Sequence, residues 1–191
     1  GYSMGGRVAQ NVALLAPERI ERLVLESVSF GIADPEERRR RSVRDAALLA
    51  EVRTEKELAA FLEGWYQLPL FCTLSGTSAL QRILRERQGN EVRELRRALK
   101  ILGVGNQPYF APRLARLSFP MFYFCGERDD AYAGRANAIS KEIPAMRVTV
   151  FPHASHDIHS QFPGEIIRVL ARIATGSGEA GGSGSCGGEE P

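Results

Sequence analysis

Gly1-Tyr2-Ser3-Met4-Gly5 opens the chain with a G-x-S-x-G pattern, which is typical of a sharp strand-to-helix turn that exposes a nucleophilic serine. Small residues at Gly1 and Gly5 let the backbone turn tightly enough to raise the Ser3 hydroxyl above a sheet. Such a turn follows a central strand. We therefore expect that strand, and several others, to precede Gly1 in the parent enzyme, and we expect this C-terminal portion to be inactive and poorly folded alone.

The residues after this turn have the pattern of a helix, a buried strand and a long helical insertion. Apolar residues recur at helical spacing between Gly5 and Ala16, whereas Leu23-Val24-Leu25 is apolar at every position, as in a parallel strand covered on both faces. From Phe30 to Leu117 no strand-like run occurs, and Ala, Leu, Arg and Glu alternate in helical periods. This insertion, residues 30–117, is here called the lid.

The strand pattern returns after the lid. Residues 121–125 and 148–151 are predicted strands, and residues 133–143 and 164–174 are predicted helices. Strands that alternate with helices indicate a parallel, doubly wound α/β sheet.

The chain is therefore divided into four parts. The core is formed by residues 1–29 and 118–174, and the lid by residues 30–117. Residues 175–191 are rich in Gly and Ser and hold almost no apolar side chain, so we expect a disordered tail.

Composition excludes several classes of protein. The 191 residues are 43% hydrophobic and 25% charged, with a net charge of +2, which is ordinary for a globular enzyme and leaves no broad cationic face for nucleic acid. The three cysteines, Cys72, Cys125 and Cys186, are far apart, which predicts no disulfide framework and favours a reducing compartment. No apolar stretch approaches the roughly 18 residues of a membrane span.

Three residues that could form a catalytic triad each follow a strand. Ser3 follows the strand expected before Gly1, and Asp129 and His156 follow the predicted strands 121–125 and 148–151. Ser3, Asp129 and His156 occur in the order Ser, Asp, His, and the carboxyl ends of parallel strands are where ligands bind in open α/β sheets. A histidine in this arrangement takes the serine proton, and the aspartate holds its tautomer. Asp130 lies in the same loop and is an alternative to Asp129.

The histidines allow a second interpretation. His153, His156 and His159 are spaced three residues apart and, with Asp157, could form a metal site. Metal ligands at this spacing need a helix or hairpin to converge them, which a loop beginning at Pro152 does not clearly provide. We therefore predict no metal and no cofactor.

Several further motifs carry a family resemblance over residues 1–173. They are Gly-Tyr-Ser-Met-Gly-Gly-Arg at 1–7, Leu-Val-Leu-Glu-Ser at 23–27, Asp-Pro-Glu-Glu-Arg from 34, Trp65 with Leu-Pro-Leu-Phe at 68–71, Gly-Val-Gly-Asn-Gln-Pro at 103–108, Gly-Glu-Arg-Asp at 126–129 and the His156 loop. In order and spacing the chain resembles the 2-succinyl-6-hydroxy-2,4-cyclohexadiene-1-carboxylate synthases. These enzymes have the α/β-hydrolase fold and act in menaquinone and phylloquinone biosynthesis.

The resemblance implies a lyase rather than a hydrolase. Pyruvate is eliminated from a cyclohexene that carries an enolpyruvyl ether, a succinyl arm and a ring carboxylate. By this analogy His156, assisted by Asp129, activates Ser3 as the base that removes a ring proton. The backbone N–H of Met4 is the expected oxyanion donor, and a second donor is expected from an earlier loop.

The resemblance also implies substrate-binding residues. Its arginines fall on Arg7, Arg41 and Arg87, and its pocket aromatics fall on Tyr2 and Trp65. Arg suits a tricarboxylate because its planar guanidinium binds carboxylates bidentately. Under a small shift of the alignment the lid partners could instead be other arginines, namely Arg38, Arg40, Arg82 or Arg85.

Two departures and two alternatives accompany this interpretation. Ser155 stands where the family usually has Gly, and Asp157 where Asn is common, and either could alter the geometry or basicity of His156. The alternatives to the lyase are a serine hydrolase acting on an ester or C–C bond, and a non-catalytic fragment. We expect a cytoplasmic protein, or a plastid one if the source is photosynthetic. The expected partners are the missing N-terminal part or other quinone-pathway enzymes.

Overall fold

The computed structural model describes residues 1–176, and within them the centre of the molecule is a sheet of three parallel strands. The strands are β1 (Leu23–Glu26), β2 (Met121–Gly126) and β3 (Met146–Phe151), arranged in the order β1-β2-β3. Leu23 pairs with Met121, which pairs with Met146 on its other side. The predicted parallel α/β sheet is confirmed, and each strand extends one or two residues beyond its apolar run.

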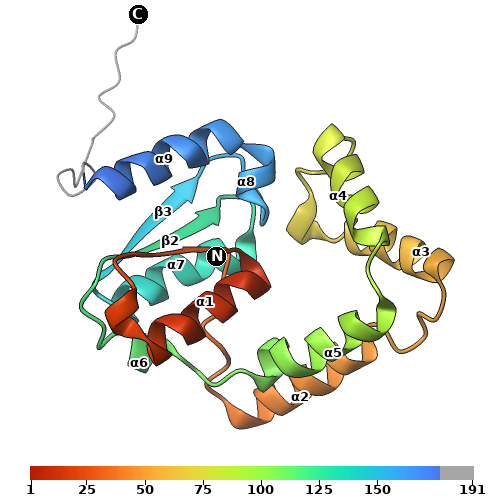
Figure 1. Cartoon of the computed structure of the whole chain (residues 1–191), viewed down its shortest axis with the longest axis horizontal. Helices are drawn as coiled ribbons and strands as arrows, with labels where there is room; N and C mark the ends of the chain where they lie inside the picture. The colour runs from red at the N-terminus through yellow and green to blue at the C-terminus, as the bar shows by residue number, and fades with distance from the viewer. Residues whose placement is uncertain (177–191) are drawn as a thin grey trace, which may run out of the picture.

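Helices cover both faces of the sheet. Successive side chains of β2 point to opposite faces, so each face packs against its own set of helices. Side chains at positions 121, 123 and 125 pack with α1 (Ser3–Leu15), α6 (Ala111–Leu114) and α7 (Asp130–Glu142). Side chains at positions 122 and 124 pack with α9 (Pro163–Thr175). Figure 1 shows α9 on the side of the strands away from α1 and α7. Burial on both faces explains why β2 is apolar throughout.

The turn that carries Ser3 is strained and is bonded to β1. Ser3 has a φ of 45°, in the left-handed region that non-glycine residues rarely adopt. Tyr2 forms an isolated parallel bridge with Glu26, and the Gly1 carbonyl accepts the Glu26 N–H at 2.9 Å. The end of β1 therefore holds the turn from which the Ser3 side chain projects.

The sequence-based assignment of Gly5 as a residue required for this turn is wrong. A Cβ on Gly5 would meet no atom within 4 Å beyond its chain neighbours and the nearby backbone of its own helix, whereas a Cβ on Gly6 would lie 2.1 Å from a methyl carbon of Val28. Gly6 is therefore the residue that must stay small, because α1 lies against Val28, in the segment after β1, at this point.

The segment between β1 and β2 is helical over most of its length. Its elements are α2 (Pro35–Ala47), α3 (Glu55–Trp65), α4 (Ser78–Gln88), α5 (Val92–Leu102), α6 and the 3₁₀ turns Pro69–Phe71 and Val104–Asn106. Side chains that cap helix N-termini explain three of the starts: Asp34 before α2, Thr54 before α3 and Thr77 before α4. Figure 1 shows α2 and α5 side by side, with α3 and α4 forming a separate pair.

Two short elements and the chain end complete the fold. The 3₁₀ turn Pro17–Arg19 follows α1, and α8 (Ile158–Gln161), which the sequence pattern did not predict, is capped by Asp157. The predicted tail lies, from residue 177 onward, outside the described residues, as does Cys186. No helix within residues 1–176 combines the length and the apolar character needed to cross a bilayer.

Candidate active site

Three side chains from separate parts of the chain meet at the carboxyl edge of the sheet. His156 Nε2 lies 3.1 Å from Ser3 Oγ, and His156 Nδ1 lies 2.7 Å from Asp129 Oδ2. Ser3 begins α1, Asp129 lies between β2 and α7, and His156 lies between β3 and α8. The structure thus brings together the three residues singled out in the sequence, and Asp129 rather than Asp130 bonds to the imidazole.

A glycine at the end of β2 lets the aspartate and histidine loops touch. A Cβ on Gly126 would lie 2.2 Å from a carbonyl oxygen of the histidine loop. Just beyond it, the Arg128 N–H donates to the Ala154 carbonyl at 2.8 Å. Asp129 and His156 are only 1% and 2% exposed. The pair is therefore held in a water-poor setting, where the hydrogen bond between them is strong.

Aromatic rings surround the His156 imidazole. The ring centroids of Tyr2, Phe71 and Tyr132 lie 5.4, 5.8 and 4.8 Å from that of the imidazole. Burial is the main cause that raises the pKa of both Tyr2 and Tyr132, so both phenols remain protonated at neutral pH. These rings exclude water from the imidazole without adding a charge beside it.

The first turn of α1 presents, beside Ser3, a backbone donor that is not bonded within the helix. Met4 is the second residue of α1, a position whose N–H has no carbonyl partner within its own helix. Met4 also lines the pocket next to Ser3. The helix N-terminus is therefore suitable for stabilising negative charge on an oxygen bound there.

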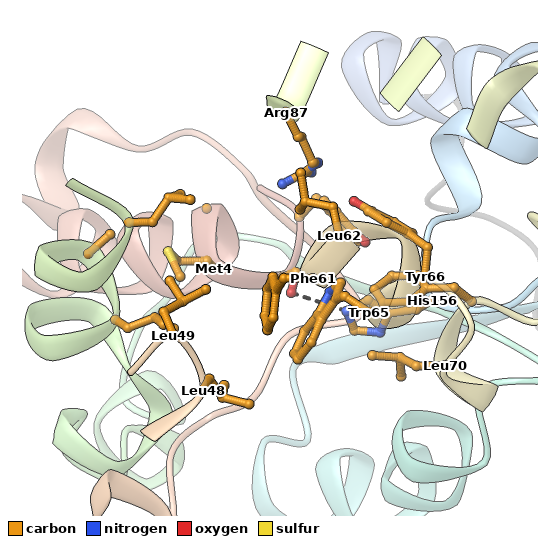
Figure 2. Close-up of a pocket in the computed structure, with 17 residues that line it drawn as sticks. Met4, Leu48, Leu49, Phe61, Leu62, Trp65, Tyr66, Leu70, Arg87 and His156 are labelled. Carbon is orange, nitrogen blue, oxygen red and sulfur yellow. Dashed lines mark hydrogen bonds between the residues drawn. The ribbon is translucent and has the colours of Figure 1, made fainter. Parts of the chain in front are cut away.

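A pocket of about 420 Å³ opens over Ser3 and His156. Its remaining wall comes from α1 and the lid and is mostly apolar. Figure 2 labels the main residues of this wall, which include Met4, Phe61, Trp65, Tyr66, Leu70 and Arg87. In Figure 2, Phe61, Trp65 and His156 group together, and Arg87 enters the pocket from α4. The site can therefore take a small molecule with apolar surface and at least one anionic group.

Three of the five residues implied for substrate binding lie on this wall. Tyr2, Trp65 and Arg87 line the pocket, and the Arg87 guanidinium carbon lies 6.0 Å from the ring centre of Tyr66. Sequence reasoning missed Tyr66. Its position directly after Trp65, at the end of a helix that also carries Phe61, was an available signal.

Arg7 and Arg41 lie elsewhere. Arg7 is 8% exposed, and within residues 1–176 its Nε and Nη1 have no hydrogen-bond partner. Burial, the main cause, lowers the pKa of Arg7, and the charge of nearby Arg41 acts in the same direction. Arg41 Nε donates to Asp45 Oδ1 at 2.6 Å. Neither arginine is on the wall of the pocket that Arg87 enters.

The three histidines do not converge on one metal site. His156 is bonded to Asp129, and His153 lies near Glu127. His159 instead joins Glu26 and Asp157, whose ligand atoms lie within 4.8 Å of one another and of His159. Glu26 Oε1 already accepts hydrogen bonds from the backbone N–H of Ile158 and from His159 Nδ1, at 2.8 and 2.9 Å. Glu26 thus fastens the histidine loop to the end of β1, a contact that sequence reasoning missed.

His159 should make stability depend on pH. Its pKa is raised, chiefly by the hydrogen bond to Glu26; burial opposes this, the charges of Glu26 and Asp157 add to it, and Arg87 opposes it. A raised pKa in the folded state means that folding favours the protonated form of His159. The stabilisation is therefore complete below the ordinary value of 6.5 and is lost as the pH rises through the folded-state pKa.

We therefore expect the difference in free energy of unfolding between the wild type and His159→Gln to shrink as the pH rises from about 5.5 to about 9. The effect should be small, because the His159 side chain is 44% exposed and water screens its charge. Urea unfolding at a series of pH values measures it. When the comparison is repeated in proteins that also carry Glu26→Gln, most of the pH dependence of this difference should disappear. A free-energy difference between the wild type and His159→Gln that grows with pH would contradict the raised pKa of His159.

The sequence is similar to a family profile and to several named proteins. The sequence profile described as the alpha/beta hydrolase fold matches residues 1–163. A protein of Escherichia coli O1:K1 named 2-succinyl-6-hydroxy-2,4-cyclohexadiene-1-carboxylate synthase is 32% identical over 173 residues, which are 91% of this chain. A Bacillus subtilis (strain 168) protein, provisionally given the same name, is 33% identical over 177 residues, or 92% of this chain. The chain spans 66% and 64% of the lengths of these two relatives.

Solved structures show the same fold. MenH from S. aureus superposes with a TM-score of 0.81 at 27% identity, over 93% of this chain and 67% of that one. An esterase from Thermogutta terrifontis superposes with a TM-score of 0.72 at 20% identity, over 92% of this chain and 63% of that one, and shows the fold alone. The α/β-hydrolase fold expected from the sequence is thus confirmed.

Proposed function

The chain belongs to the α/β-hydrolase fold family, and from this premise we propose that it carries the catalytic centre of a pyruvate-eliminating lyase. The substrate would be 2-succinyl-5-enolpyruvyl-6-hydroxy-3-cyclohexene-1-carboxylate, and the product 2-succinyl-6-hydroxy-2,4-cyclohexadiene-1-carboxylate. The observation that carries the proposal is the hydrogen-bonded line from Asp129 through His156 to Ser3, open to a pocket whose wall includes Arg87. The choice of this reaction, among those that such a site could catalyse, rests on the names of the two sequence relatives.

Each group has a role that its position supports. Asp129 keeps the proton of His156 on Nδ1, so Nε2 is free to accept the proton of Ser3. The Ser3 oxygen then removes a ring proton from the substrate, the ring forms its second double bond, and the C–O bond to the enolpyruvyl group breaks with its electron pair leaving on oxygen. The Met4 N–H would stabilise the negative charge that develops on oxygen. Protonation of the departing enolate yields pyruvate.

The substrate carboxylates would be bound by arginines. Arg87 is the cation on the described pocket wall. Arg7 is buried, its Nε and Nη1 have no hydrogen-bond partner within residues 1–176, and it does not line the pocket, so we propose that it acts on the substrate through its charge. Arg41 is already paired with Asp45, and we propose that it acts on the substrate through its charge near Arg7. Because the relatives compared are bacterial, we propose the bacterial cytoplasm as the location.

An ester hydrolase remains the second candidate, because the same three side chains serve acyl transfer and the pocket wall is mostly apolar. The test is to supply both classes of substrate to the protein at its natural length. Release of pyruvate from the cyclohexene substrate, with poor cleavage of a p-nitrophenyl ester and poor labelling by a fluorophosphonate, would support the lyase. Rapid ester cleavage and labelling without pyruvate release would replace it with the hydrolase.

Arg87→Ala should lower kcat/KM for the tricarboxylate substrate by about 10- to 100-fold, the loss expected when a charged hydrogen-bond partner is removed. Arg85→Ala is the matched control, since Arg85 lies on the same helix, is exposed and does not line the pocket. It should stay within about twofold of the wild type. Loss of activity in Arg85→Ala but not in Arg87→Ala would move the carboxylate contact to Arg85.

A further inference from the structure

Three polar side chains form a closed ring of hydrogen bonds beside His156. Thr73 Oγ1 lies 2.6 Å from Ser155 Oγ and donates to Gln161 Oε1, and Gln161 Nε2 donates to Ser155 Oγ at 3.0 Å. Each hydroxyl has one proton to donate. Since the Thr73 proton is used by Gln161, the Ser155 hydroxyl donates to Thr73, and every member of the ring both donates and accepts.

The ring joins the lid to the loop that carries the catalytic histidine. Thr73 belongs to the lid, whereas Ser155 directly precedes His156 and is fully buried. A backbone bond lies next to the ring, because the His156 N–H donates to the Leu70 carbonyl at 3.2 Å. The peptide that carries the imidazole is therefore bonded to the lid on one side, while the Asp129 loop contacts the same loop on the other.

We propose that Thr73 is a positioning residue for His156: through Ser155 and Gln161 it sets where the imidazole stands between Asp129 and Ser3. The proposal rests on the proton relay of the proposed function and is independent of the substrate. The relay is sensitive to position, because the 3.1 Å between His156 Nε2 and Ser3 Oγ is already at the long end of hydrogen-bond distances. The ring thus gives Ser155 a role that a glycine could not fill, because glycine has no hydroxyl.

The test uses two variants at Thr73 and a matched control in the same lid. Thr73→Val removes the hydroxyl and keeps the shape, whereas Thr73→Ser keeps the hydroxyl. Thr77→Val is the control, because the Thr77 hydroxyl caps α4 and bonds to the Leu74 carbonyl and the Leu80 N–H. This control removes a lid hydroxyl that is not in the ring.

In the protein at its natural length, Thr73→Val should lower kcat for pyruvate release by about tenfold, since small misplacements of a catalytic group are costly. KM should change little, because Thr73 does not line the pocket. Thr73→Ser should restore kcat to within about twofold, and Thr77→Val should leave kcat within about twofold even where its melting temperature falls. Equal losses in Thr73→Val and Thr77→Val, or no loss in Thr73→Val, would overturn the proposal.

NMR of the His156 ring separates failure of this proposal from failure of the proposed function. The Nδ1–H bonded to Asp129 is observed directly, without any substrate. Thr73→Val should shift this resonance and speed its exchange with water, while Thr77→Val should leave it unchanged. If the wild type released no pyruvate, the lyase assignment would fall, and an unchanged Nδ1–H signal in Thr73→Val would then overturn the positioning role on its own.

Discussion

Replacing Ser3 or His156 by alanine should lower kcat for pyruvate release by about 10²- to 10⁴-fold, the usual contribution of a positioned proton-transfer group. The two side chains are 3.1 Å apart, and both face the pocket. The loss should appear in kcat more than in KM, because both groups act on a proton that moves in the transition state. Steady-state assays of pyruvate formation in the protein at its natural length measure it.

The double variant should be about as slow as either single variant. Ser3 and His156 belong to one proton-transfer unit, in which His156 takes the Ser3 proton and Ser3 takes the ring proton, so removal of one leaves the other without its function. His153→Ala is the control for the histidine change, because His153 lies in the same loop with an exposed side chain and no bond to Asp129. It should keep nearly full activity. Losses that multiply in the double variant would show that the two residues act independently.

Asp129→Asn should lower kcat by about 10⁴-fold while leaving the fold intact, because the change exchanges the imidazole tautomer. The Asp129 carboxylate accepts a hydrogen bond from His156 Nδ1–H at 2.7 Å, which leaves Nε2 as the acceptor for the Ser3 proton. An amide nitrogen at this position donates to Nδ1 instead. The ring proton then resides on Nε2, which can no longer take a proton from Ser3.

Asp130→Asn provides the matched control for this prediction. Asp130 is the next residue, begins α7 and is exposed, so the same chemical change there should leave kcat within about twofold. Circular dichroism and urea unfolding of both variants check that the fold is kept. If Asp130→Asn were inactive and Asp129→Asn active, the alternative aspartate considered from the sequence would be the true partner.

The strands β1 and β2 could be predicted from the sequence because burial on both faces leaves a local signal. Residues 121–125 are apolar at every position, and the structure buries all of β2. The start of β3 was missed because Arg147 is exposed and interrupts the apolar run. The short helix α8 was missed because its four residues are too few to show helical periodicity.

The chemistry of Ser3, Asp129 and His156 could also be anticipated, since each is a polar residue placed just beyond a strand. The groups that orient them could not. Tyr132 and Thr73 have no distinctive local pattern, and the motif that contains Phe71 did not assign it a role. Phe71 and Tyr132 reach His156, and Thr73 reaches the neighbouring Ser155, only because the lid and α7 fold against the histidine loop. The family resemblance implied Arg87, which does line the pocket, but it also implied Arg41, which the structure pairs with Asp45 away from the pocket wall.

By itself the sequence determined the parallel α/β core, the serine turn and the order of the three candidate catalytic residues, because these depend on side-chain periodicity and on turns of a few residues. Only the tertiary structure decided that Gly6 rather than Gly5 must be small, that Asp129 faces the imidazole, and that a ring through Thr73 links the lid to His156. The physical reason is that these contacts join residues far apart in the chain. Their distances are set by how the lid and the strands pack, and no local pattern encodes that packing.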